Sequence, residues 1–168
     1  LSGHEGHTSF DLFGEDAREI GDFDGDGYVD VAISARSDER PGSFAPEAEV
    51  DPACPASGSQ TGAIFIFSKP ALDEGPLLSP QPKFVIYGSR NGDELNAIAG
   101  AVDLNKDGLS DLILGGRLSD EVARDAGVAE VYWGQPSPDS GTTQVICSPA
   151  ARLLGRQAGG QLGRSVVG

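Results

Sequence analysis

The chain has 168 residues, enough for one domain with a sizeable core, and its 24 glycines and 11 prolines indicate many short strands joined by turns. Its 26 acids outnumber its 12 bases, and the formal charge of −14 argues against nucleic acid or an anionic membrane surface as a partner, because both reward a basic protein. No apolar run approaches the roughly 18 residues of a membrane helix, so we expect no membrane insertion.

The N-terminal segment, residues 1–12, carries His4 and His7 in GHEGHTSF. An H-x-x-H spacing can supply two metal ligands, but neither a helix nor a third ligand accompanies it here. We therefore expect a solvated terminal segment rather than a metal site.

The next stretch, GDFDGDGYVDVAIS at residues 21–34, places three aspartates at alternate positions and follows them with a glycine and a fourth aspartate. Calcium takes about six to eight oxygen ligands, which a short loop supplies when oxygens alternate along it and a glycine permits a sharp turn; magnesium fits less well because it requires strict octahedral geometry. A solvated acidic turn is the alternative for a single copy. We expect a calcium loop at residues 22–30, with the side chains of Asp22, Asp24, Asp26 and Asp30 and the backbone carbonyl of Tyr28 as ligands.

The residues after this loop indicate a strand rather than a helix. Val29, Val31 and Ile33 alternate with acidic or small residues. Ile33 also stands where an EF-hand loop carries its bidentate glutamate. The pattern therefore argues against an EF-hand and places the acids in a turn between two strands.

A long polar stretch, residues 37–61, separates this strand from two further strand candidates, GAIFIFSK at 62–69 and KFVIYG at 83–88. Loops of this length without secondary structure are uncommon and often functional or disordered, and a tolerated surface insertion is the other interpretation. Cys54 in this stretch and Cys147 further on are compatible with one disulfide in an oxidising compartment. Two unpaired thiols, or partners elsewhere, remain the alternative.

The acidic spacing recurs in DLNKDGLSDLILGG, residues 103–116, where it is again followed by an apolar strand. Two copies in the same register are hard to explain as solvated turns. We therefore expect two Ca²⁺ sites, whose first role is structural because the ion reverses the repulsion among the acids. The second loop spans 103–111, with the side chains of Asp103, Asn105, Asp107 and Asp111 and the carbonyl of Leu109 as ligands.

The two halves of the chain share more than the loops. The second half also continues with a strand that begins with glycine, GVAEVYWG at 127–134, and a further short strand, TQVICS at 143–148. Each unit then has four strands, and a four-stranded antiparallel sheet is the blade of a β-propeller. We expect an all-β fold with one blade at residues 13–90 and a second at 91–149.

These features resemble the FG-GAP repeats of the integrin α-subunit propeller and its bacterial and eukaryotic relatives, named for a Phe-Gly before the calcium loop and a Gly-Ala-Pro after the strand that follows. The Phe-Gly place holds Phe13-Gly14, Leu95-Asn96 and Leu162-Gly163, so that residues 150–168 look like the start of a third repeat. Ser34-Ala35-Arg36 and Gly115-Gly116-Arg117 stand where the family has Gly-Ala-Pro.

A propeller closes with roughly four to eight blades, so two blades and the start of a third leave exposed edges and blade faces. We expect a partial propeller that belongs to a longer protein, or a propeller completed by assembly of several copies. A third possibility is that the segments 1–12 and 150–168 cover the open faces.

The resemblance implies that the calcium turns line one face and that ligands are met at the opposite face, on connections such as 37–61 and 117–127. The predicted function is a calcium-binding extracellular module for protein recognition, adhesion or structural assembly, secreted, at the cell surface or periplasmic. Its partner would be another protein or further copies of itself. We recognise no catalytic constellation and expect no enzyme.

The alternative function is carbohydrate binding, either as a lectin-like module or as an accessory segment of a carbohydrate-active enzyme. The aromatic residues Tyr132 and Trp133 bear on this alternative. Because they lie at the end of a predicted blade strand, we interpret them as packing between blades rather than as a sugar platform.

Overall fold

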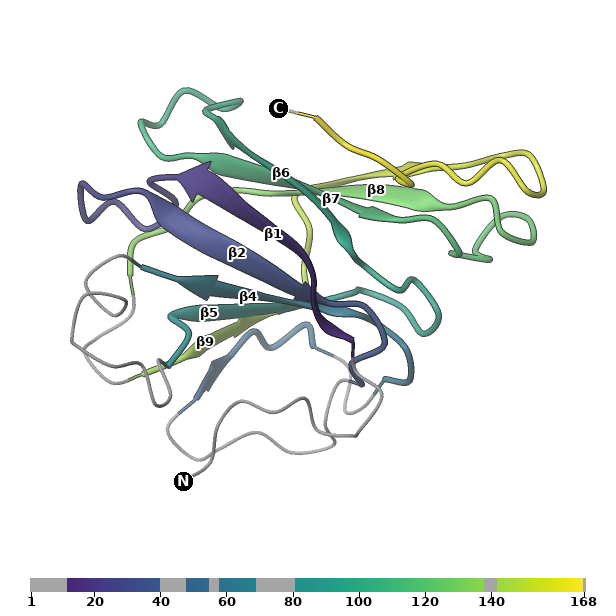
Figure 1. The fold of residues 1–168 in the computed structure, drawn as a ribbon, viewed down its shortest axis with the longest axis horizontal. Helices are drawn as coiled ribbons and strands as arrows, with labels where there is room; N and C mark the ends of the chain where they lie inside the picture. The colour runs from purple at the N-terminus through teal and green to yellow at the C-terminus, as the bar shows by residue number, and fades with distance from the viewer. Residues whose placement is uncertain (1–11, 40–47, 55–57, 69–80, 138–141, 168) are drawn as a thin grey trace.

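The computed structural model describes residues 12–39, 48–54, 58–68, 81–137 and 142–167, and all structural statements concern these ranges (Figure 1). They form ten strands in two sheets, without a helix in the described ranges, so the expected all-β fold is confirmed. Consistently, these ranges contain no helix that could span a membrane.

The first sheet begins with four antiparallel strands that lie side by side in the order of the chain, with β3 (Glu49–Val50) intervening in sequence between the second and the third. Two further strands extend it beyond the fourth, and both of these pair in parallel. In spatial order the strands are β1 (Phe13–Gly21), β2 (Asp30–Ala35), β4 (Ala63–Phe67), β5 (Phe84–Tyr87), β9 (Gln144–Ile146) and β3 (Glu49–Val50).

The second sheet is a four-stranded antiparallel meander. Its strands are β6 (Ala97–Val102), β7 (Asp111–Gly116), β8 (Val128–Tyr132) and β10 (Ala151–Leu154). Figure 1 shows the turns after β1 and after β6 at the same end of the two sheets, and the connection after β7 at the opposite end. The two predicted calcium loops are these two turns.

The strand β4 explains why two separate cores form. Its five residues are apolar and buried on both faces, as expected for a central strand covered on both sides. Ile64 and Ile66 point into the core between the two sheets, and Phe65 and Phe67 point into a second core on the other face of the first sheet.

The core between the sheets joins both units into one body. Strands β1 and β6 lie against each other, and Gly100 permits this approach because a Cβ there would lie 2.7 Å from Ile20 Cα. Phe23, at the start of the first acidic loop, packs edge-on against Phe84 with ring centroids 5.2 Å apart. The main contributors besides these are Ile64, Ile66, Ile86, Leu95, Ile98, Leu112, Leu114, Val128 and Tyr132.

The predicted position of the fourth strand in the second unit is wrong. A strand does form within 143–148, but this strand, β9, pairs with β5 of the first sheet. The fourth place in the second sheet belongs to β10, which lies in the segment expected to begin a third repeat. The β9 segment is held to the first sheet by its backbone and by a covalent bond: the Gln144 N–H donates to the Lys83 carbonyl at 2.9 Å, and Cys147 pairs with Cys54.

The long stretch 37–61 contributes to the first sheet in its described part. Its strand β3 pairs with β9, and the Cys54–Cys147 disulfide, with Cα atoms 5.1 Å apart, decides between the two alternatives left open for the cysteines. Ala48 and Cys54 pack against the second core. The described part of this stretch therefore extends the first sheet at one edge and packs against its outer face through Ala48 and Cys54. Of the N-terminal segment 1–12, all but Leu12 lies outside the described residues.

The start of the predicted third repeat contacts the second sheet through a backbone hydrogen bond. An equivalent hydrogen bond joins the start of the second unit to the first sheet. The Leu95 N–H donates to the Thr61 carbonyl at 3.1 Å, and the Leu162 N–H donates to the Ala126 carbonyl at 2.9 Å. The preceding residues, Glu94 and Gln161, both have positive φ angles. The chain thus repeats one backbone junction about 67 residues apart (162 minus 95).

Candidate metal centre

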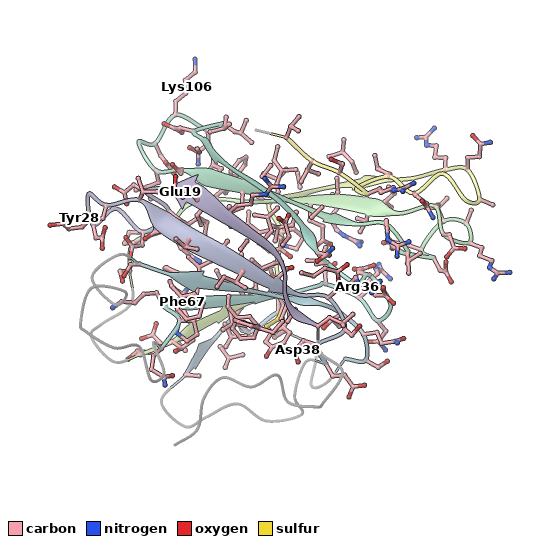
Figure 2. All side chains as sticks on the ribbon, viewed as in Figure 1. Glu19, Tyr28, Arg36, Asp38, Phe67 and Lys106 are labelled. Atoms are coloured by element: carbon pink, nitrogen blue, oxygen red, sulfur yellow. A yellow bond between two sulfur atoms is a disulfide. The ribbon has the colours of Figure 1, made fainter. Side chains whose placement is uncertain are left out.

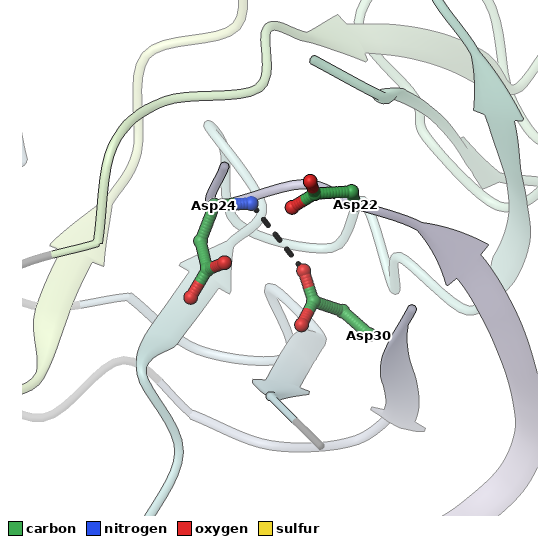
Figure 3. Close-up of side chains that lie close together, drawn as sticks. All are labelled: Asp22, Asp24 and Asp30. Atoms are coloured by element: carbon green, nitrogen blue, oxygen red, sulfur yellow. Dashed lines mark hydrogen bonds between the residues drawn. The ribbon is translucent and has the colours of Figure 1, made fainter. Parts of the chain in front are cut away.

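The first acidic loop is shaped by its own carboxylates. Asp22 accepts hydrogen bonds from the N–H groups of Gly25 and Gly27 at 2.7 and 3.1 Å. Both glycines have positive φ angles, which side-chain-bearing residues adopt at a cost. At the end of the loop, Asp30 Oδ2 accepts from the Phe23 N–H at 2.8 Å and from the Asp24 N–H at 3.3 Å (Figure 3).

Three of the predicted ligands converge on one point. Asp22, Asp24 and Asp30 each present a carboxylate oxygen within 4.8 Å of the other two (Figure 3). Asp24 is 4% exposed and Asp30 is fully buried, and Asp24 Oδ2 and Asp30 Oδ1 accept no hydrogen bond from any residue described. A buried acceptor without a donor is costly, and a cation bound between these oxygens would remove that cost. The donor set of carboxylate oxygens fits calcium.

The electrostatics of the loop favour the same conclusion. Burial raises the pKa of Asp30 to about 7, and the charges of Asp24 and Asp26 raise it further, against the hydrogen bond from the Phe23 N–H. Burial likewise raises the pKa of Asp24, and the charges of Asp26 and Asp22 add to the increase, against hydrogen bonds from the Asp26 N–H and the Ser137 side chain. These carboxylates oppose one another's ionisation without a cation, and a divalent ion reverses the sign of the interaction.

The other two predicted ligands of this loop lie outside the group of three. Asp26 is exposed, and its Oδ1 accepts from the Tyr28 N–H at 2.8 Å. The Tyr28 side chain points away from the loop into solvent (Figure 2). The carbonyl of Tyr28 stays a predicted ligand.

The second loop repeats the hydrogen bonds of the first, position by position. Asp103 accepts from the N–H groups of Lys106 and Gly108, as Asp22 does from Gly25 and Gly27. Asp111 Oδ2 accepts from the Leu104 and Asn105 N–H groups at 2.7 and 3.4 Å, as Asp30 does from Phe23 and Asp24. The middle positions agree as well: Asn105 accepts from Asp107 and Asp107 from Leu109, as Asp24 accepts from Asp26 and Asp26 from Tyr28.

The second loop nevertheless differs as a metal site. Asp103, Asn105 and Asp107 are all exposed, and one of the three is an amide rather than a carboxylate. Its acids do not form a group of three with the close oxygen spacing of the first loop, judged over the part of the chain that the structure describes. Asp111 is buried, but its Oδ1 accepts from the Gly134 N–H at 2.9 Å. The carbonyl of Leu109 stays a predicted ligand, like that of Tyr28.

A segment that the sequence analysis did not single out holds the first loop in place. We call residues 134–137 the bridging segment. The Gln135 N–H donates to the Phe23 carbonyl at 3.0 Å, and the Ser137 N–H donates to the Asp24 carbonyl at 3.1 Å. These contacts are made by backbone groups, so no side-chain pattern could have predicted them.

The aromatic pair at the end of β8 divides between core and surface. Tyr132 is buried between the sheets, in agreement with the packing role predicted for it. Trp133 is 42% exposed. The prediction that it packs between blades is therefore wrong. Its side chain falls on the outer surface because consecutive residues of a strand point to opposite faces.

Compared with models of known protein families and with curated proteins, the sequence matches none.

Proposed function

We propose that the chain is a calcium-binding β-propeller module of the FG-GAP type that acts outside the cytosol in protein recognition, adhesion or structural assembly. The observation that carries the proposal is the first loop, where two buried carboxylate oxygens, on Asp24 and Asp30, have no hydrogen-bond donor among the described residues. Calcium would supply the positive charge that these oxygens lack. It usually coordinates about six to eight oxygens, a number that such a loop can offer.

The propeller part of the proposal is supported by the repeated architecture. Strands β1, β2, β4 and β5 form one antiparallel meander and β6, β7, β8 and β10 form another, each with an acidic loop between its first and second strands. The four-stranded antiparallel meander is the unit from which propellers are built. The two sheets pack face to face, with their first strands adjacent.

The extracellular part is supported by the disulfide between Cys54 and Cys147, since structural disulfides persist in oxidising compartments. Calcium is also plentiful there, so loops with exposed ligands would be filled. The partner would be another protein or further copies of the chain.

Calorimetric titration of the whole chain with Ca²⁺, after treatment with chelator, tests the proposal. We expect saturable binding with two equivalents of calcium, and no comparable response to Mg²⁺ at the same concentration. Asp30→Asn should remove the tighter site, because its buried carboxylate is a shared ligand and loop cap. Glu49→Gln, a matched loss of one negative charge on the exposed edge strand β3, should bind as the unaltered chain does.

Absence of calcium binding in the unaltered chain would reject the proposal. Equal loss of binding in Asp30→Asn and Glu49→Gln would show that general negative charge, rather than this loop, attracts the ion.

A further inference from the structure

The two acidic loops are joined by backbone hydrogen bonds. The bridging segment touches both: the Gly134 N–H donates to Asp111 Oδ1 of the second loop, while the Gln135 N–H donates to the Phe23 carbonyl of the first. The contacts of the segment with the two predicted metal sites thus come from consecutive residues.

A second connection runs directly between the loops. The Ser110 N–H, one residue before the buried Asp111, donates to the Asp22 carbonyl at 2.7 Å. The Leu109 side chain also lies over Gly25, since a Cβ on this glycine would be 3.1 Å from Leu109 Cδ2. Asp22 and Asp111 are predicted ligands of different ions. The Ser110 hydrogen bond therefore links the backbone of one predicted ligand to the residue next to the other.

We propose that these contacts, through the bridging segment and Ser110, couple the two loops, so that calcium bound in the first loop raises the affinity of the second loop for calcium. The inference rests on the proposed calcium binding and adds an order of binding and a direction of influence to it.

The order of binding follows from the ligands. The first loop has four carboxylates and two buried oxygens without hydrogen bonds from described residues, whereas the second has three carboxylates, an amide and a lysine at Lys106. More carboxylates and less solvent around them raise calcium affinity. The first loop should therefore fill at lower calcium concentration.

The direction of influence follows from what binding orders. Calcium in the first loop fixes residues 22–24, whose three carbonyls accept from Ser110, Gln135 and Ser137. Fixing Gln135 restrains its neighbour Gly134, whose N–H donates a hydrogen bond to Oδ1 of the Asp111 carboxylate. A hydrogen bond to the back of a ligating carboxylate orients it and improves metal binding. The second ion then binds a loop that has already lost part of its conformational freedom.

Calorimetric titrations of single-loop variants measure the coupling. Asp30→Asn leaves the second loop to bind alone, and Asp111→Asn leaves the first. We expect the second loop to bind calcium about fivefold or more weakly in Asp30→Asn than in the second step of the unaltered chain. The first loop fills while the second is still empty in both proteins, so its affinity in Asp111→Asn should equal that of the first step in the unaltered chain.

A pair of variants at Gln135 separates coupling from damage to a loop. Gln135→Pro removes the N–H that donates to the Phe23 carbonyl, whereas Gln135→Ala keeps it and removes only the side chain. The proline variant should bind two calcium ions with weaker coupling, because the Ser110 and Ser137 hydrogen bonds remain, and the alanine variant should keep the full coupling. If both variants keep it, the Gln135 N–H does not transmit the effect and the role of the bridging segment is rejected.

Amide hydrogen exchange supplies a test that does not depend on the folding of the proline variant. In Asp111→Asn, where only the first loop can bind, added calcium should slow exchange of the Ser110, Gly134, Gln135 and Ser137 amides. Unchanged exchange at these amides, or equal affinity of the second loop in Asp30→Asn and in the second step of the unaltered chain, would overturn the coupling while calcium binding stands. Absence of any calcium binding would overturn both proposals.

Discussion

Glu130 is a charged residue in the middle of an apolar strand, and its surroundings explain how it is tolerated. The side chain is fully buried and accepts from the Ser89 hydroxyl at 2.6 Å, from Arg152 Nε at 2.7 Å and from the Tyr132 hydroxyl at 2.9 Å. Burial raises the pKa of Tyr132 well above its ordinary range, and the charge of Glu130 adds to this increase, so the hydroxyl keeps the proton that it donates. A buried carboxylate needs this many partners.

Asp93 lies in the same polar cluster and leads to a prediction about pH. Burial raises its pKa to about 6, the charge of Glu130 raises it further, and Ser119 and Arg152 oppose the shift. Because the folded-state pKa lies above the ordinary value of 3.8, the protonated form stabilises the fold. This stabilisation is complete below pH 3.8 and is lost as the pH rises through about 6.

Asp93→Asn should remove this loss. We expect the free energy of unfolding of the variant, relative to the unaltered chain, to rise by about 3 kcal/mol from acidic pH to pH 7. Urea denaturation in chelator at several pH values measures the difference, from which contributions common to both proteins cancel. For Glu49→Gln, on the exposed strand β3, the difference should stay constant with pH. A constant difference for Asp93→Asn as well would contradict the assigned role of burial.

At the scale of the elements, local patterns predicted most of the strands and both acidic loops, but not β3 or β10, and non-local pairing was beyond them. Alternation of apolar residues marks β2, and a short unbroken apolar run marks β4, whatever their partners are. The hydrogen bonds that shape each acidic loop join residues at most seven positions apart, so the spacing of the acids suffices to predict them. The placement of β9 depends instead on an edge formed by β5 and on a disulfide to a distant residue.

The same distinction applies to the candidate site. Asp22, Asp24 and Asp30 were predicted from spacing and lie together. The contacts from Gln135 and Ser137 come from residues more than 100 positions away and are made by N–H groups that every residue except proline has. These backbone contacts therefore leave no signal in the side chains of the sequence.

The junction between the second sheet and Leu162 gives a prediction about an element contact. Gly127 has a positive φ, and a Cβ there would lie 2.1 Å from the Leu162 carbonyl oxygen, a backbone atom. Gly159 also has a positive φ but has nothing within 4 Å of its Cβ position. The two glycines therefore form a matched pair that separates backbone strain from close packing.

Gly127→Ala should lower the free energy of unfolding more than Gly159→Ala does, by roughly 1 to 3 kcal/mol, because only the first must also displace Leu162. Urea denaturation of both variants measures the difference. Exchange of the Leu162 amide, which donates to the Ala126 carbonyl, should accelerate only in Gly127→Ala. Equal effects of the two substitutions would show that the junction contributes nothing beyond the strain of each glycine.

At the scale of the whole molecule, the disulfide is the longest covalent connection. It joins residues 93 positions apart. It ties the segment 48–54, which contains β3, to the residue that follows β9. A cross-link over a long loop stabilises chiefly by restricting the unfolded chain. The fold as a whole should therefore depend on the oxidation state of Cys54 and Cys147.

Reduction should lower the free energy of unfolding by about 4 kcal/mol, the value expected for a loop of this length. Urea denaturation with and without a thiol reductant measures this change. The double variant Cys54→Ser and Cys147→Ser should match the reduced protein and should not respond to the reductant. A stability unaffected by reduction would contradict the bond as a constraint on the unfolded chain.

The segment 48–54 makes the two outer faces of the molecule different from each other. On the outer face of the first sheet, Ala48 and Cys54 of a disulfide-linked segment pack against the second core, whereas on the second sheet Leu153 is half-exposed and Ala129 and Val131 are buried. Another sheet that stacked on the outer face of the first sheet would have to displace Ala48 and Cys54 from the second core. The disulfide-linked segment would thus make the two ends of any such stack unequal, as a cap does at one end of a filament.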